Sequence, residues 1–322
     1  MLLTTEMERN MSIATEITAL NNNLTAAKNA VTAKGGTVGD TGLAGLAAEI
    51  AGIPSGGSLA NYGTVKYLDS NNVEQTVTMA TEEDFYELCN RHGFQSLVHI
   101  NGVSFEKAKI QEVELADGIT FIPDDFLRYC ENCYNVVLPD SIVYIGDEFC
   151  VGSRLHNELN LKNVKYIGTD FCYALNAYNG QGYNQPISLP KVEYIGLNFL
   201  AGNSQFNSTV SLNDNCRAIG GQFLYNCWAY NQPFTIPTGL EDVSPEANPG
   251  GGFMKECRAF IGPLVCNSPY PPNNDNYTLS TTSSSAALYT TGVTLTGTYA
   301  QAWKNALPDK TSSPYRKLIV GS

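Results

Sequence analysis

The sequence has few of the side chains that carry most enzyme chemistry. Among 322 residues there are only three histidines, His92, His99 and His156. Cys89-x-x-His92 sits at the end of an expected short helix, but it has no third member to complete a catalytic set. Gly-x-Ser-x-Gly, phosphate-loop and paired catalytic carboxylate patterns are missing. We therefore predict that the chain is not an enzyme and that it uses no cofactor.

Positive charge and long apolar runs are also scarce. The chain has 19 Lys and Arg against 31 Asp and Glu, a net charge of -12, and its basic residues are not clustered. This excludes nucleic acid and anionic membranes as expected partners. No run reaches the roughly 18 apolar residues of a membrane-spanning helix. The first ten residues contain two acids and no apolar core, so they do not predict a secretory signal.

Residues 1–57 are predicted to form a helical segment for oligomerisation and attachment. Apolar residues recur at steps of 4, 3, 4, 3 and 4, which is the heptad rhythm of a coiled coil. We predict self-association, as a homotrimer or a dimer; the alternative is an amphipathic helix that packs on its own domain. The predicted seam consists of Ile13, Ile17, Leu20, Leu24, Ala27 and Val31.

A second short helix follows the seam, and a Pro-Ser-Gly-Gly linker closes the region at residues 54–57. The stretch resembles a segment common in bacteriophage tail and fibre proteins. In them a helix ends in Ala-Lys-Gly, and a Gly/Asp/Thr turn precedes Leu-Ala-x-x-Ile-x-x-Ile. The matching residues are Ala33, Lys34, Gly35, Asp40, Thr41, Leu46, Ala47, Ile50 and Ile53.

Residues 58–112 are predicted to form a small α+β module. Two strands, over residues 62–69 and 73–80, flank a polar turn at 70–72. Thr81 to Asp84 has the pattern of a capping box that opens a helix with Phe85 and Leu88 on one face. Further strands are expected over residues 97–103 and 110–115.

Residues 113–322 repeat themselves and are predicted to form a solenoid with a C-terminal cap. The strand-centre position recurs at intervals of 23, 23, 28, 23 and 24 residues, followed each time by a buried aliphatic residue and then a phenylalanine. Ala247 replaces the sixth phenylalanine, and Phe253 resumes the phase after an insertion. A helix with Tyr299, Trp303 and Leu307 on one side is expected to cap the stack. The three columns are Leu115, Leu138, Leu161, Leu189, Leu212 and Ile236; Ile122, Ile145, Ile167, Ile195, Ile219 and Val243; and Phe126, Phe149, Phe171, Phe199 and Phe223.

This pattern resembles the BspA-type leucine-rich repeats of bacteria. Leu138-Pro139 with Ile145-Gly146 and Phe149, and Leu189-Pro190 with Ile195-Gly196 and Phe199, carry the resemblance, which runs from residue 113 to about 270. It implies one strand and one short helical or irregular return per unit, with Asp or Thr capping the helix. It also implies binding or adhesion on bacterial and protist surfaces or in virions, without catalytic residues.

The nine cysteines and the acid-rich turns have two readings each. Cys130-x-x-Cys133 suggests half of a zinc site, but Cys130, Cys227 and Cys257 recur in register, which indicates core packing. An odd number of cysteines also argues against a complete disulfide framework. A column of acids suggests calcium or, with better support, capping of turns, and we predict no metal. Its members are Asp124, Asp125, Asp147, Glu148 and Asp170.

Aromatic residues in polar loops are the expected contact surface, because rigid rings flanked by amides suit sugar or protein binding. Packing against the solenoid is the alternative for the same rings. The candidates are Tyr178, Tyr183, Trp228, Tyr230, Tyr270 and Tyr277.

These features together predict a virion structural protein, a phage tail or head fibre. Its N-terminus would join copies of itself and other virion proteins, and its solenoid would touch a host-surface glycan or protein. The alternatives are an adhesin on a bacterial cell surface and an enzyme with an unrecognised site.

Overall fold

The computed structural model describes residues 59–89, 96–174, 182–243, 252–271, 279–280, 292–307 and 316–321. The chain divides into two compact units, Met1–Leu59 and Ala60–Ser322. The predicted seam from Ile13 to Val31 and the phage-like segment lie outside the described residues. In the described ranges, no helix is long and apolar enough to cross a membrane.

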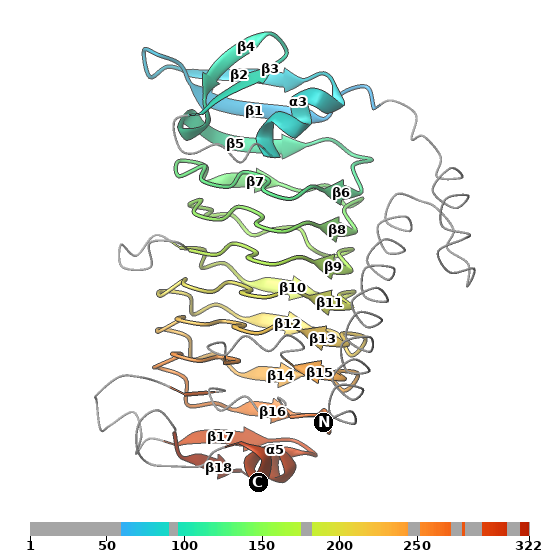
Figure 1. Ribbon diagram of the computed structural model, residues 1–322, viewed down its shortest axis with the longest axis vertical. Helices are drawn as coiled ribbons and strands as arrows, with labels where there is room; N and C mark the ends of the chain where they lie inside the picture. Colours follow the sequence, from blue (N-terminus) through green and yellow to red (C-terminus); the bar gives the residue numbers. More distant parts are fainter. Residues whose placement is uncertain are drawn as a thin grey trace, which may run out of the picture. The chain divides into compact units, whose positions relative to one another are not determined.

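The second unit begins with the small α+β module, where the sequence predicted it (Figure 1). Strands β1 (Gly63–Leu68) and β2 (Glu74–Met79) pair antiparallel. Helix α3 (Glu82–Tyr86) opens with the predicted capping box, in which Thr81 and Asp84 exchange side-chain and backbone hydrogen bonds. A 3-10 turn, η1, follows at Glu87–Cys89. Local sequence signals therefore define this module: alternating buried and exposed residues in the strands, and the capping box at the start of α3.

A hairpin and a third strand complete the module and join it to the repeats. β3 (Leu97–Ile100) and β4 (Val103–Glu106) form the hairpin, whose Asn-Gly turn has positive φ at both residues. After η2 (Lys107–Lys109), β5 (Ile110–Leu115) pairs antiparallel with β1 and parallel with β7 (Asn135–Val137). The predicted boundary at residue 113 falls inside β5, because this strand belongs to both parts.

The repeats stack as the rungs of a β-solenoid, one above another in Figure 1. Each rung contributes one strand or extended segment to a broad parallel face. β10 pairs with β12, and β14, β16, β17 and β18 pair in that order. The bounds are β10 (Ile187–Leu189), β12 (Val210–Leu212), β14 (Phe234–Ile236), β16 (Leu264–Cys266), β17 (Val293–Thr296) and β18 (Leu318–Val320).

A second parallel sheet of six two-residue strands runs beside the first. Its register places the predicted isoleucines directly over one another, and Ile122, Ile145, Ile167, Ile195 and Ile219 are buried. Tyr144, Tyr166 and Tyr194 stack beside them with ring centroids 4.6 and 4.7 Å apart. The strands are β6 (Phe121–Ile122), β8 (Tyr144–Ile145), β9 (Tyr166–Ile167), β11 (Tyr194–Ile195), β13 (Ala218–Ile219) and β15 (Asp242–Val243).

The phenylalanine column forms the centre of the core, as predicted. Successive rings from Phe126 to Phe223 stack nearly parallel, with centroids 5.2 to 5.7 Å apart. Phe253 resumes the column 5.1 Å from Phe223, so the insertion before it does not break the core. At the C-terminal end, α5 (Ala300–Ala306) buries Trp303, whose Nε1 donates to the Ser268 carbonyl at 2.9 Å.

The described returns contain consecutive turns and no helix, so of the two expected forms the irregular return is confirmed and the short helix is wrong. Asp125, Glu148 and Asp170 adopt φ near +60°, a conformation that breaks a helix. The predicted helix-capping acids instead link rungs. The Asp124 carboxylate accepts the N–H of Asp147 at 2.8 Å, and the Asp147 carboxylate accepts the N–H of Thr169 at 2.7 Å.

The glycine of the Ile-Gly turn is explained by this close stacking. A Cβ atom on Gly168 would lie 2.4 Å from the carboxylate of Asp147 and 2.7 Å from its backbone nitrogen. The repeat therefore requires glycine here to let one rung lie on the next.

Candidate binding surface

The broad parallel face is the open surface of the solenoid, and we call it the strand face. Alternation along each rung points one side chain inward to the core and the next outward to solvent. Paired residues in register form an outward column, for example Glu114 with Val137 and Ser188 with Ser211. The column is mostly small and polar toward the C-terminal rungs. Its members are Glu114, Val137, Asn160, Ser188, Ser211 and Thr235.

The ladder of the strand face breaks between β12 and β14, and again at the rung formed by residues 158–162, which has no strand of its own. No backbone–backbone hydrogen bond of the described residues joins this rung to β7 or β10. Toward β7, side-chain amides take the place of the missing backbone partners. Asn157 accepts the N–H of Val136 at 3.0 Å and donates to its carbonyl at 2.8 Å, and Asn160 donates to the Leu138 carbonyl at 3.1 Å. The rung is therefore tied to β7 by side chains.

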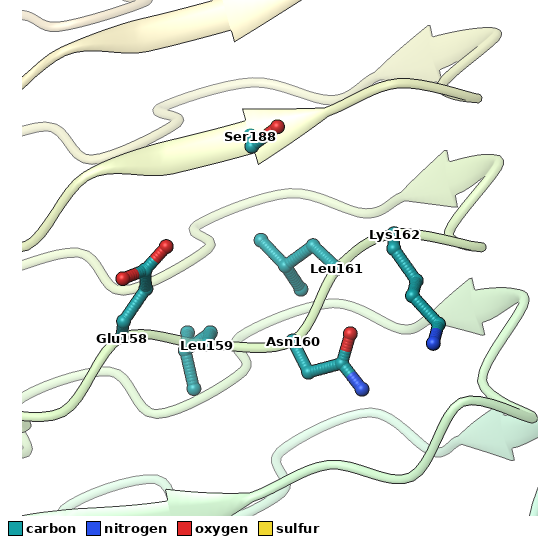
Figure 2. Close-up of a pocket in the computed structure, with 6 residues that line it drawn as sticks. All are labelled: Glu158, Leu159, Asn160, Leu161, Lys162 and Ser188. Carbon is teal, nitrogen blue, oxygen red and sulfur yellow. The ribbon is translucent and has the colours of Figure 1, made fainter.

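A shallow hollow of about 330 Å³ opens on the other side of this rung, between it and β10. Figure 2 shows the amide of Asn160 and the ammonium of Lys162 turned away from Ser188, whereas the carboxylate of Glu158 turns toward the rung of Ser188. Because Ser188 is short and Asn160 and Lys162 lean toward the opposite rung, little side-chain volume fills the space between. The lining residues are Glu158, Leu159, Asn160, Leu161, Lys162 and Ser188.

The charges around the hollow are unequal. Lys162 forms an ion pair with Asp140, which also accepts a hydrogen bond from Asn160 Nδ2 at 2.8 Å. These contacts lower the pKa of Asp140, so the pair stays ionised and internally neutral. Glu158 is exposed and has no ion pair among the described residues. The hollow therefore has a net negative charge from Glu158.

The aromatic residues predicted as contacts divide into three groups. Tyr183 and Tyr230 are core residues, with 3% and 0% of their surface exposed, which corrects their assignment to the binding surface. The ring of Tyr230 stacks between Phe206 and Phe260, with centroids 5.7 and 5.8 Å away. Tyr178 and Tyr277 lie outside the described residues.

The two remaining aromatic residues reach the surface. Tyr270 is 54% exposed. Trp228 is half-buried, and the guanidinium of Arg258 lies over its ring at 4.5 Å. The structure thus keeps these two as accessible rings, separate from the rungs that line the hollow.

The cysteines occupy the core, as their register predicted. The thiols are free, and eight of the nine are buried; Cys89 is half-buried. Burial raises the pKa of Cys89 and of Cys130 to about 12, which keeps both thiols protonated. Cys257 donates to the carbonyl of Leu224 at 3.1 Å and so serves as a small core residue with a satisfied S–H.

The side chains of the acid column contact backbone N–H groups and Arg128, and they do not converge on a common point as metal ligands would. Arg128 lies between two of its members, with Nη1 3.1 Å from Asp125 and Nε 2.6 Å from Glu148. Burial raises the pKa of Asp170, and Asn198 donates a hydrogen bond to its carboxylate at 2.7 Å. Within the described ranges, no group of three or more His, Cys, Asp or Glu side chains could hold a metal ion.

The residues of the hollow were not singled out from the sequence, although a signal was present. The strand-centre residue is followed by proline in three rungs, at Pro139, Pro190 and Pro237, by Ala116 and Asn213 in two others, and by the charged Lys162 in the interrupted rung. The longest repeat interval, 28 residues, also follows this rung. Departures from the repeat were therefore the available guide to the candidate surface.

Comparison with known proteins supports the repeat assignment. The family model described as "BspA type Leucine rich repeat region (6 copies)" matches residues 62–178, a little over a third of the chain. The match begins earlier than the predicted start at residue 113, because it includes the module whose β5 is shared with the stack. No curated protein matches the chain, and no solved structure matches it. Residues 62–178 thus match a BspA-type repeat region, and the described part of this range includes the first rungs of the β-solenoid, an architecture typical of binding domains rather than catalytic ones.

Proposed function

We propose that this protein is an adhesin that acts at a bacterial cell surface and binds its target through the strand face. The observation that carries the proposal is the β-solenoid itself. It holds an outward column of exposed side chains on a rigid stack, whereas the residues that define the repeat are buried in the core. The BspA-type match supports the same conclusion, because the repeats it resembles bind and adhere on cell surfaces.

The strand face suits contact with another surface for a physical reason. Its outward side chains are short at Ser188, Ser211 and Thr235, so a ligand can approach the backbone closely. Ordering these side chains loses little rotamer entropy, because serine and threonine have few rotatable bonds. Binding spread over several rungs can therefore reach useful affinity without a deep pocket.

A first experiment tests location and a second tests the face. An antibody against the full chain should label intact cells of the source bacterium. Labelling only after permeabilisation would contradict the cell-surface proposal. Beads coated with the full chain should adhere to host cells or extracellular matrix, and Ser188→Arg with Thr235→Arg should reduce adhesion. The matched control, Gln205→Arg with Asn215→Arg, adds the same charge at exposed positions off the strands and should adhere normally.

The phage tail or head fibre remains the second candidate. It depends on the heptad seam and the phage-like segment, which lie outside the described residues. Homotrimer formation and attachment to other virion proteins belong to this hypothesis and stay predictions. Mass spectrometry of purified particles separates the two candidates, because a fibre requires a fixed copy number relative to the major capsid protein, in a multiple of three for a trimer.

A further inference from the structure

We propose that the hollow between residues 158–162 and β10 is a subsite for one pyranose ring of a non-acidic saccharide, either neutral or carrying an amino group. The proposal rests on the proposed binding function and specifies the chemistry of one place on the strand face. It is argued from the size of the hollow, its hydrogen-bonding groups, its charge and its surroundings.

The size of the hollow fits a small ligand. Its volume of about 330 Å³ lies at the lower end of the range of small-molecule sites, about 300–1,000 Å³. A single sugar ring is a ligand of this scale, whereas a folded protein surface would meet the hollow only with one inserted side chain. The shallow opening leaves the ring's other positions free for further sugars.

The hydrogen-bonding groups at the hollow are mainly acceptors. The carboxylate of Glu158 and the hydroxyl of Ser188 form no side-chain hydrogen bond within the described part of the chain. Asn160 uses its Nδ2 toward β7, and Figure 2 shows its amide oxygen on the side nearer Ser188. A carboxylate, an amide oxygen and a hydroxyl together suit a ligand with several adjacent O–H or N–H donors. Vicinal sugar hydroxyls have that arrangement.

The charge of the hollow selects against anionic ligands. Lys162 is neutralised by Asp140, so Glu158 supplies the uncompensated charge at the rim. An acidic sugar or a phosphate would meet this carboxylate, and the lining holds no cation other than the paired Lys162 to offset it. An amino sugar would gain from the same carboxylate, and a neutral sugar would use it as a hydrogen-bond acceptor.

The surroundings allow a longer chain to continue across the rungs. Val137, on the β7 side of the interrupted rung, is 43% exposed and offers an apolar contact for a sugar's C–H face. On the β10 side, the outward residues Ser211 and Thr235 have short side chains and leave room above the backbone for further sugars. Hydrogen-bonded neighbouring strands lie about 4.7–4.9 Å apart, so an oligosaccharide would cross several rungs from one occupied ring.

The test measures binding of the full chain to free sugars by titration calorimetry and ligand-observed NMR. The probes are methyl glycosides of glucose, galactose and mannose, with glucosamine, and N-acetylneuraminic acid as the acidic comparison. We expect millimolar binding of at least one neutral or amino sugar and none of the acidic sugar. Ser188→Leu fills the hollow and should weaken binding at least tenfold. Asn215→Leu, at an exposed position off the strands, should change it less than twofold.

A second variant guards against a folding defect in the first. Glu158→Gln changes an exposed side chain and should weaken glucosamine more than a neutral sugar, because it removes the charge but keeps the acceptor oxygen. Binding of the acidic sugar alone, or equal effects of Ser188→Leu and Asn215→Leu, would overturn the proposal. If coated beads adhere through the strand face but no free sugar binds, the subsite is refuted and the adhesin proposal stands. If the beads do not adhere and no free sugar binds, the subsite proposal and the adhesin proposal are both refuted.

Discussion

Replacing Phe171 with alanine tests whether the phenylalanine column is the main source of stability. The side chain is fully buried, and its ring stacks on Phe149 and Phe199 with centroids 5.2 Å away on both sides. Phe→Ala in a core costs about 3–5 kcal/mol, and the two ring contacts place the expected loss of unfolding free energy in the upper half of this range. With a urea slope of about 2 kcal/mol/M, the unfolding midpoint should fall by about 2 M.

Urea titration followed by far-UV circular dichroism measures this midpoint. Phe171→Leu keeps part of the volume and should lose less, and Tyr270→Ala, at an exposed position, should change stability by no more than about 0.5 kcal/mol. Because rungs contact mainly their neighbours, hydrogen exchange should accelerate most in the adjacent rungs. A loss below about 1 kcal/mol for Phe171→Ala would refute the idea that this column carries the core.

Three further predictions concern single rungs and the cap. Gly168→Ala should lower the unfolding free energy by about 2 kcal/mol or more by thermal or urea unfolding, because its Cβ would overlap Asp147. Burial raises the pKa of Asp170 in the folded state. The contribution of Asp170 to the free energy of unfolding is therefore fully present below its unfolded-state pKa and is lost as the pH rises through its folded-state pKa. Asp170→Asn should stabilise the protein at pH 7 but not at pH 3. Trp303→Ala should cost about 3–5 kcal/mol and expose the last rungs to hydrogen exchange first.

The repeated interior could be predicted because one residue type recurs at each core position. Ile145, Ile167 and Ile195 stand in register in neighbouring strands, as their spacing indicated. The same logic placed Phe253 back in the column after the insertion. Periodicity works here because each rung must repeat the shape of the last to bury its side chains.

The local backbone of the returns could not be predicted in the same way. Asp and Thr after the Ile-Gly turn are common helix caps, so the sequence left a short helix and an irregular return both open. Several return residues adopt left-handed φ, including Leu127 and Cys150, which have no intrinsic preference for it. Contacts between rungs impose this conformation, and one rung read alone does not contain it.

The predicted aromatic contacts failed at Tyr183 and Tyr230 for a related reason. A tyrosine flanked by asparagine looks like an exposed loop residue in the sequence. In the solenoid, however, Asn184 accepts the N–H of Asn207, and Asn207 accepts the N–H of Asn231, each at 2.8 Å. These asparagines link successive rungs, and the adjacent side chains of Tyr183 and Tyr230 are buried between the rungs. Polar neighbours therefore do not indicate exposure in a repeat whose amides replace backbone partners.

The same reasoning explains where a ligand site should be sought in such a chain. Positions that obey the repeat are committed to stacking: a side chain at Gly168 would collide with the preceding rung, and Phe171 contacts the rungs on both sides. Specific recognition needs groups that are not committed in this way. The rung of residues 158–162 makes no backbone hydrogen bonds to the neighbouring strands in the described part of the chain, and asparagine side chains replace them on the β7 side only. An irregular rung thus leaves polar groups open on an otherwise closed surface, which makes its departure from the repeat the strongest guide to binding.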